Sequence, residues 1–524
     1  MLGAAVAGCD AGGPSGPTPP DPEADAYTVT VELPELMIGG RQVQLAFLIR
    51  TADGEAAGGV PAHARAVRGG DIISAAERTD DLGFFLVEFV PSEDVAENVI
   101  EVYVGSDEPE AFTLVAHVPV RIAEAEPTLR TLLLRWPRNV NPGFVRYRLT
   151  RRNASGSPPG DTVLTTSQDE GFTAFEDGPL PPGTSYLYRV DVELADEEVV
   201  RGPELHVHAG VHATLAGEAQ DVVLDEARGR LYVAVYNRSR FDDPVGEIAV
   251  LDPETLEVLH TLAVADGTRN GPVDLERSAD GQTLYAAVSG AGTVLVIDLD
   301  TFDADAVDVT EAVGHEVLYG VVEHRPGHAV VWANTVNGGS PGSDYVYLAE
   351  VDVTDGLTVR RLPNSATEPF EYVGHYTSRI VADPDGEHLL ALNRLSSGRL
   401  LRLRLTEDGL EYVGQRFVSP FTDVDQESEI VAFGSGELIE AASLETVGTV
   451  DRGLPAFAAG GDLLYQFPST RYLETGDVRV IDVATQAVLR TIRLDAKPGA
   501  VALRSDEGVA YFTLDERVFA LALD

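Results

Sequence analysis

Short runs of alternating polar and apolar residues cover most of the chain from residue 27 onward, with turn-forming residues between them. Alternation with a period of two is typical of strands that bury one face, and no helical period competes with it. Residues 27–122 contain the runs YTVTVEL, VQLAFLIR, FFLVEFV, NVIEVYV and FTLVAHVPV. A segment of about one hundred residues with short strands is the size of a β-sandwich, and we predict one here.

The segment 211–524 repeats one pattern, in which an apolar strand ends in VLD or an equivalent. A second apolar strand, such as LYVAV or LLALN, precedes each copy. The copies are placed at Asp252, Asp298, Asp352, Arg404, Ser443, Asp482 and Asp524. Their mean spacing of about 45 residues is the period of a four-stranded propeller blade. Seven copies predict a seven-bladed β-propeller.

The last copy, VFALALD, has no fourth strand behind it. The segment VHATLAG at 211–217 precedes the first full blade and is predicted to supply that strand. Pairing of the first strand with the last blade closes the ring and leaves no open sheet edge.

Three segments resemble known families. The strand I-x-V-[IL]-D-x-x-T followed by P-x-x-x-x-x-S-x-D-G-x-x-L-Y, clearest at 247–286, resembles the YVTN family of bacterial seven-bladed β-propellers. In 27–122, a DG…GV segment before a TD..G turn resembles bacterial Ig-like domains. Residues 127–209 resemble a fibronectin type III domain through LLLRW and LPPGTSYLYRVDV.

The fibronectin type III resemblance implies a second β-sandwich, with Trp136 buried in its core and Tyr186 as the tyrosine-corner residue. The short join AEAEP at 123–127 implies a fairly stiff stalk. The fold class predicted from the sequence is therefore all-β, with two β-sandwich modules followed by a seven-bladed β-propeller.

Acidic residues are spread along the whole chain. The 85 Asp and Glu against 38 Lys and Arg give a formal net charge of −47, and Lys497 is the only lysine. This charge excludes nucleic acid as a partner, because phosphates need a basic footprint. Acidic, lysine-poor surfaces resemble those of proteins from salt-adapted microbes, where salt screens the self-repulsion. A GC-rich genome that favours arginine codons is the alternative explanation for the arginine bias.

The single cysteine, Cys9, follows VAG, and VAGC resembles a bacterial lipobox, in which the cysteine is lipidated. The Gly/Pro/Ser-rich stretch behind it resembles a flexible tether. Only eight residues precede Cys9, without a positive region, so either the true start lies upstream or the match is chance. We expect residues 1–26 to be a truncated lipoprotein signal and tether. This implies a cell-envelope protein that contacts the membrane through a lipid anchor only.

The sequence shows no G-x-S-x-G elbow, H-E-x-x-H helix, phosphate-binding G-x-x-x-x-G-K-[ST] loop or CxxC pair. Positions at the starts of the innermost strands are expected to face the propeller channel. The candidates are Asp221, Asp274 and Asp423, with Tyr319, Arg379 and Phe457 as further positions. Their types are mixed and do not form a metal-ligand set, so no cofactor is expected.

Three further groups have spacing that can suit a metal. They are His206, His208 and His212; His324 and His328; and Asp423, Asp425 and Glu427. For the first group, at the junction with the propeller, we expect exposed strand histidines. The second would need a helix to converge, whereas the Pro-Gly between them predicts a turn. The third lacks the glycine of an EF-hand loop.

Four long connections between the second and third strands of their blades are predicted to emerge on one propeller face. They are 237–246, 334–344, 393–398 and 468–476. They bring cationic and aromatic side chains to an acidic protein: Arg238, Arg240, Arg394, Arg471 and Tyr472. Loops on a rigid scaffold commonly carry function, while drift in loop length without a ligand is the alternative.

These observations favour a non-enzymatic, lipid-anchored cell-envelope protein that presents its propeller for protein or glycan binding. The alternative is a hydrolase or lactonase-like propeller enzyme with a divalent metal in the central channel. A structural part of an envelope assembly is a third hypothesis.

Overall fold

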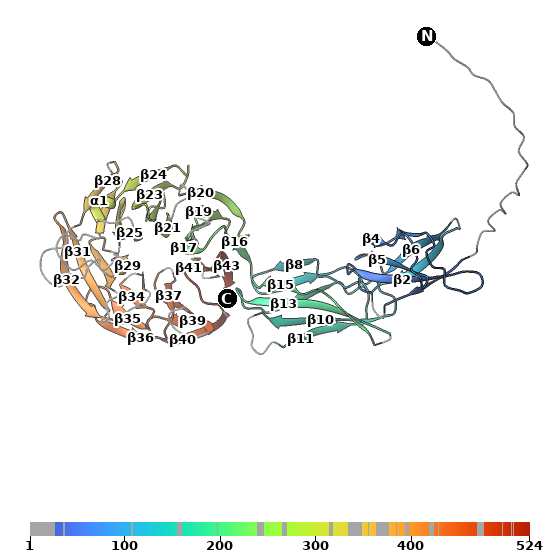
Figure 1. The fold of residues 1–524 in the computed structure, drawn as a ribbon. Coiled ribbons are helices and arrows are strands. Elements are labelled where there is room, and N and C mark those ends of the chain that lie inside the picture. Colours follow the sequence, from blue (N-terminus) through green and yellow to red (C-terminus); the bar gives the residue numbers. More distant parts are fainter. Residues whose placement is uncertain are drawn as a thin grey trace, which may run out of the picture.

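The chain folds into β-strands almost throughout, arranged as two small modules and a ring (Figure 1). The computed structural model describes residues 27–34, 37–105, 108–154, 160–195, 197–237, 246–264, 270–313, 318–333, 348–354, 356–362, 377–383, 385–393, 398–418, 424–427, 429–458, 460–468, 476–494, 496–504, 506 and 508–523. The only helix within these ranges is α1, Thr310–Val313. No helix among the described residues is long and apolar enough to cross a membrane.

The first module contains two antiparallel sheets, with strand orders β1-β2-β5-β4 and β3-β6-β7. Both sheets contribute to one core, in which alternate residues of β2 (Leu45, Phe47 and Ile49) are fully buried. The alternating sequence pattern is thus explained by one buried face on each strand. The strands are β1 (Thr28–Glu32), β2 (Val43–Arg50), β3 (Ala62–Arg68), β4 (Asp71–Ala75), β5 (Phe84–Val90), β6 (Glu97–Val104) and β7 (Glu110–Val115).

The second module also has two sheets around a shared core, with orders β12-β9-β8 and β11-β10-β13-β14, and β15 pairs with β13. Trp136 and Tyr186 lie buried in this core, as the sequence predicts. The strands are β8 (Glu124–Pro127), β9 (Leu132–Arg135), β10 (Phe144–Asn153), β11 (Thr162–Ser167), β12 (Ala174–Asp177), β13 (Ser185–Leu194), β14 (Val199–Arg201) and β15 (Leu205–His208).

The rest of the chain is a β-propeller: four-stranded antiparallel sheets lie around a centre, and each of the six that follow β16 runs in chain order from its innermost to its outermost strand (Figure 1). Seven such sheets are present in the described residues. The first three are β17 (Ala219–Asp225), β18 (Arg230–Tyr236), β19 (Gly246–Leu251), β20 (Val258–Ala263); β21 (Gly271–Arg277), β22 (Thr283–Ser289), β23 (Thr293–Asp298), β24 (Ala304–Asp308); and β25 (Leu318–Arg325), β26 (His328–Ala333), β27 (Leu348–Asp352), β28 (Thr358–Arg361).

The next three sheets have the same order and lead round to the closing sheet. They are β29 (Thr377–Ala382), β30 (His388–Asn393), β31 (Arg399–Thr406), β32 (Gly409–Phe417); β33 (Val424–Glu427), β34 (Ile430–Phe433), β35 (Glu437–Glu440), β36 (Thr446–Thr449); and β37 (Leu454–Phe457), β38 (Leu463–Phe467), β39 (Gly476–Asp482), β40 (Val488–Leu494).

The ring is closed by a strand from the start of the propeller, as the sequence predicts. The closing sheet has the order β16-β43-β42-β41, with β16 (His212–Thr214), β41 (Val501–Leu503), β42 (Val509–Leu514) and β43 (Arg517–Ala522). In it, His212, Ala213 and Thr214 pair with Phe519, Val518 and Arg517. The first and last strands of the ring therefore share one sheet.

The repeated D-x-x-T segment forms the turn between the third and fourth strands. In the first sheet, the Asp252 carboxylate accepts the N–H of Thr255 at 3.0 Å, and the next residue, Leu256, has a φ of 57°. The aspartate side chain thus takes the place of a neighbouring strand as the acceptor for a backbone N–H group of the turn. The turn reverses the chain, so that the fourth strand runs back along the third. The equivalent positions are Asp298 with Phe302 (φ 62°) and Asp482 with Gln486 (φ 60°).

Candidate functional site

One edge of the propeller, where the innermost strands begin, is the candidate binding surface; we call it the loop face. Neighbouring strands of each sheet are antiparallel, so the connection from second to third strand lies at this same edge. Long connections join β18 to β19, β26 to β27, β30 to β31 and β38 to β39. In the other three sheets the strand bounds leave two or three residues at this position. The four long connections therefore share one edge.

The side chains expected to act on this face fall outside the described residues. They are Arg238, Arg240, Arg394, Arg471 and Tyr472. The same is true of the channel candidate Asp423 and of Cys9. The described part of the loop face is its centre, where the channel candidates Asp221 and Asp274 lie.

Carboxylates at the starts of the innermost strands bind the backbone of the next sheet. Asp221 in β17 accepts the N–H of Leu275 in β21 at 2.9 Å. Asp274 in β21 accepts the N–H of Val321 in β25 at 2.9 Å. Each of these hydrogen bonds joins two neighbouring sheets, so the two aspartates tie adjacent sheets together around the centre.

A cluster of three acids and one arginine surrounds the start of β21; we call Asp221, Asp274, Glu276 and Arg379 the channel cluster. Arg379 donates from Nη1 to Asp274 Oδ1 at 2.9 Å, and its side chain is 48% exposed while that of Asp274 is 4% exposed. Burial raises the pKa of Asp274 to about 7, with Asp221 adding to the rise and Arg379 opposing it. Burial, followed by repulsion from Asp274, raises the pKa of Glu276 to about 8.

Both oxygens of Asp274 already have donors, because Arg379 binds Oδ1 and Val321 binds Oδ2. A divalent cation at this carboxylate would have to displace the guanidinium of Arg379. Burial and the neighbouring acids raise the pKa values of Asp274 and Glu276, so these acids hold protons more tightly than exposed carboxyl groups do. The channel cluster is suited to structural ties and to proton binding.

Four innermost strands, β17, β21, β25 and β29, have a one-residue register shift near their start. Asp221, Asp274 and Arg379 each directly follow such a shift. In β25 the residue after the shift is Gly320. A Cβ there would collide with the ring of Trp332 and with the Asp274 carboxylate, so only glycine fits beside the channel cluster.

Two other predicted channel positions were wrong by one residue. Tyr319 packs against the core shared by the third and fourth sheets, because the register shift puts Gly320 in its place. Phe457 is buried in a core cluster, and it is its backbone N–H that reaches the centre, donating to Asp425 in β33 at 2.8 Å. Asp425, which the sequence suggested only as part of a calcium-loop spacing, is thus a further tie between sheets.

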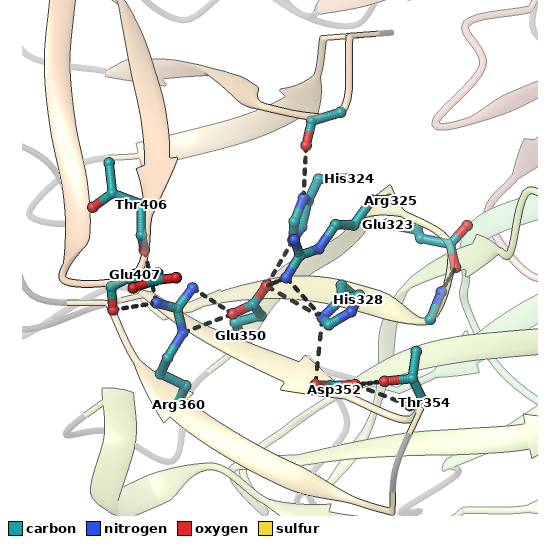
Figure 2. A network of polar contacts seen from close by, with 12 residues as sticks. Glu323, His324, Arg325, His328, Glu350, Asp352, Thr354, Arg360, Thr406 and Glu407 are labelled. Atoms are coloured by element: carbon teal, nitrogen blue, oxygen red, sulfur yellow. Dashed lines mark hydrogen bonds and ion pairs between the residues drawn. The ribbon is translucent and has the colours of Figure 1, made fainter.

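A buried polar network lies at the opposite edge of the ring, around Glu350 in β27 (Figure 2). Glu350 Oε1 lies 2.9 Å from Nε2 of His324 and 3.4 Å from Nδ1 of His328. Arg360 donates to Oε2 from Nε at 2.8 Å and from Nη2 at 2.6 Å. Burial favours a raised pKa at Glu350, but hydrogen bonds from His324 and Arg360 outweigh it and lower the pKa to about 2.

The Glu350 network joins the third sheet to the fourth. Arg360 donates from Nη1 to the carbonyl oxygens of Thr406 at 2.7 Å and Glu407 at 2.8 Å, and Nδ1 of His324 lies 3.3 Å from the carbonyl oxygen of Gly386. Oxygen atoms that can accept a hydrogen bond thus lie near both ring nitrogens of His324. Its contacts span two sheets of the ring, so the network is structural.

The sequence did not predict this network, and the expectation that His324 and His328 stay apart was wrong. The expected turn between them forms, with Gly327 at a φ of 76°. As a β-hairpin, that turn brings the two imidazole rings to 6.0 Å, and both face Glu350. The available signal was Glu350 itself, a charged residue within the otherwise apolar run of β27.

The junction histidines also cluster, contrary to the expectation of exposed strand residues. His206 is exposed, but His208 and His212 are partly buried, and the rings follow one another at 5.1 Å and 5.8 Å. Nδ1 of His208 lies 2.9 Å from Ser185 Oγ. Burial, followed by the nearby Arg517, lowers the pKa of His208 to about 4, so neutral imidazoles pack at this junction.

Among the described residues, one group of acids and histidine has ligand atoms close enough for a metal: Asp383, Asp385 and His388, within 4.8 Å of one another. Arg402 Nη2 donates to Asp383 at 3.1 Å and to Asp385 at 3.5 Å. The guanidinium of Arg402 already neutralises these acids, so we propose no metal site there.

No family model matches the sequence, and no curated protein is significantly similar to it. Among solved structures, the β-propeller domain of Cps50 (Swd1) from Myceliophteria thermophila is similar, with 16% identity and a TM-score of 0.44 over 59% of this chain and 98% of that chain. A chain of the mitotic checkpoint complex is similar with 14% identity and a TM-score of 0.42, over 59% and 93%. Neither likeness bears on ligand or activity here.

Proposed function

We propose that this chain is a non-enzymatic, lipid-anchored cell-envelope protein that binds a protein or glycan on its propeller. Two β-sandwich modules of the Ig-like and fibronectin type III kinds form the stalk, and the propeller has seven blades of the YVTN type. The observation that carries the proposal is the placement of four long connections at one edge, the loop face. The acids at the centre of that face are engaged in ties between sheets.

The residue types in the long connections support recognition of a partner. Arg238, Arg240, Arg394, Arg471 and Tyr472 carry the side chains that dominate binding energy at protein interfaces, arginine and tyrosine. They belong to a chain with a net charge of −47, so at this face they favour a partner with exposed acidic or neutral polar groups. Nucleic acid is not a partner in this proposal.

A short connection of the same propeller can replace the long connections in a test of the loop face. Each long connection is replaced by the short one of β22–β23 (Gly290–Gly292), and the variants are compared with wild type on a glycan array and in pull-downs from native membranes. We expect the bound partner to be lost while the melting temperature stays within a few degrees. A partner retained by the variant with all four replacements contradicts the proposal.

The lipid anchor is tested at Cys9, expressed with its native upstream sequence. We expect incorporation of labelled fatty acid and recovery in the membrane fraction. A Cys9→Ser variant is expected to lose both. Equal labelling of the two proteins, or no labelling of either, rules out the anchor.

The charge of −47 also supports adaptation to high salt, where the acidic surface is screened. We expect the free energy of unfolding to rise between low and molar salt. A flat dependence argues for codon bias as the source of the arginine-rich composition.

One observation favours the alternative of a hydrolase or lactonase-like propeller enzyme: Asp274 and Glu276 have raised pKa values at the channel, and perturbed carboxyl groups are frequent in active sites. This alternative predicts a divalent metal bound near one per chain and hydrolysis of lactone or ester substrates. Both should be lost in an Asp221→Asn, Asp274→Asn variant. Absence of metal from purified protein together with absence of hydrolysis leaves the binding function.

A further inference from the structure

A cleft at the joint between the first and second modules gathers arginine side chains. It has a volume of about 460 Å³. The charged residues that line it are Arg41, Arg121, Arg138 and Arg201, with Glu93 and Asp94. In the whole chain acids outnumber bases by 85 to 38, so the cleft reverses the sign of charge found elsewhere.

The four arginines come from four separate segments. Arg41 follows the turn after Gly40, Arg121 lies on the link between the modules, Arg138 follows β9 and Arg201 ends β14. All four side chains are exposed. Convergence of like charges from separate segments is unfavourable by itself, and this favours a ligand of opposite charge.

The joint is held by hydrogen bonds that fix the cleft walls. The N–H of Val118 donates to Asn141 Oδ1 at 2.6 Å, and Asn141 Nδ2 donates to the Val118 carbonyl oxygen at 2.9 Å. Gly39 donates to the carbonyl oxygen of His117 at 2.9 Å. Val118 and Asn141 are both buried. The cleft is therefore formed before any ligand arrives, which lowers the entropic cost of binding.

The cleft arginines have donors to offer. The side chains of Arg41 and Arg201 make no hydrogen bond or ion pair with any residue in the described ranges. Arg121 is 3.9 Å from Glu93, a distance too long for a hydrogen bond. Arg138 is paired with Glu170. At least two guanidinium groups are thus available, each able to bind an oxyanion through two parallel N–H groups.

We propose that this cleft binds an oxyanion group, a sulfate or phosphate, either free or carried on a saccharide. This site lies in the stalk and is independent of the loop face. The rest of its lining is proline, glycine and aliphatic residues, so a nucleobase finds no aromatic ring to stack on. The acidic surface around the cleft restricts access to compact anionic groups, because a long polyanion would be repelled.

Titration calorimetry of the full chain tests the proposal, with sodium sulfate and a sulfated disaccharide as probes at constant ionic strength set by chloride. We expect wild type to bind, and an Arg41→Gln, Arg201→Gln variant to bind at least roughly tenfold more weakly. The matched control is Arg68→Gln, Arg135→Gln, which removes two exposed arginines of the same modules outside the cleft. It is expected to bind as wild type does.

Tighter binding of the disaccharide than of sulfate identifies a saccharide as the source, and equal binding identifies the free anion; either result supports the site. Absence of binding by both probes overturns the proposal, as does equal weakening by the control variant. Melting curves check that each variant is folded. If the double variant loses its cooperative melt, the two single variants replace it and are expected to show intermediate losses.

Discussion

Two buried carboxylates lie at opposite ends of strand β25 and have opposite proton affinities. At its start, the N–H of Val321 binds Asp274; at its end, His324 binds Glu350. Both carboxylates are 4% exposed. Yet the pKa of Asp274 is raised to about 7, and that of Glu350 is lowered to about 2.

The difference lies in the number of cations that each carboxylate has around it. Asp274 shares the single cation Arg379 with two other acids of the channel cluster. Glu350 has Arg360, His324 and Arg325 within ion-pair distance. Burial is the main cause of the raised pKa at Asp274, whereas the hydrogen bonds from His324 and Arg360 outweigh burial at Glu350, so depth and local charges together set the two pKa values.

The largest expected effect follows removal of the acid from the cation-rich end. A Glu350→Ala variant leaves the buried donors of His324 and Arg360 without their acceptor, and we expect a loss of about 3–5 kcal/mol in the free energy of unfolding at pH 7. Urea denaturation measures it. The control is Glu387→Ala, an exposed acid on the neighbouring sheet, expected to change stability by less than about 0.5 kcal/mol. Equal denaturation midpoints for the two variants would contradict the importance of the network.

A smaller, pH-dependent effect is expected when the cation is removed from the acid-rich end. An Arg379→Gln variant leaves three acids without their cation. We expect a loss of about 1–3 kcal/mol at pH 8 and less at pH 5, where the acids bind protons more readily. The control Arg490→Gln removes an exposed arginine of β40. A loss that is equal at both pH values would show that Arg379 acts through packing rather than charge.

The smallest effect concerns the slope of stability with pH. Asp274 and Glu276 have folded pKa values of about 7 and 8, above their ordinary 3.8 and 4.5, so their contribution is present at low pH and is lost as the pH rises through 7–8. An Asp274→Asn, Glu276→Gln variant is expected to flatten the fall of stability between pH 5 and 8 by on the order of 1–2 kcal/mol for each pH unit. Denaturation at a series of pH values measures it.

A Glu350→Gln variant provides the opposite control for that slope. The folded pKa of Glu350 lies below its ordinary 4.5, so its contribution is present above pH 4.5 and is lost as the pH falls toward 2. We expect this variant to change the slope only on the acid side. A variant at either end that alters the slope in the other window would refute the assignment of charge states.

Local patterns predicted much of the fold. Alternation predicted the strands, whereas the turn that the Asp252 side chain stabilises in the D-x-x-T segment was not predicted. Closure by 211–217 was predicted because this apolar segment belongs to no full blade and the last blade lacks its fourth strand. In the structure, His212–Thr214 supplies that strand. Each of these inferences needed only neighbours in sequence or the rule that edges are covered.

The site was predicted less well, because its residues are brought together by register and by contacts between sheets. Asp221 and Asp274 lie near Arg379 in the channel cluster, whereas Tyr319 packs against a core because a one-residue shift exchanges the two faces of a strand. The Glu350 network forms only when the β25–β26 hairpin pairs with a third strand, β27, so its prediction requires the tertiary arrangement. The arginine cleft needed two modules in contact, and no local pattern contains that information.

The pairing of β16 with β43 also has a mechanical consequence. β15 belongs to the second module and β16 to the closing sheet, and only residues 209–211 separate them. Any tension between the second module and the propeller therefore acts directly on the strand that closes the ring. β16 is held there by three paired residues, His212 to Thr214. A force sufficient to pull β16 free would open the ring at its last sheet, so the strength of the attachment and the integrity of the propeller depend on the same short pairing.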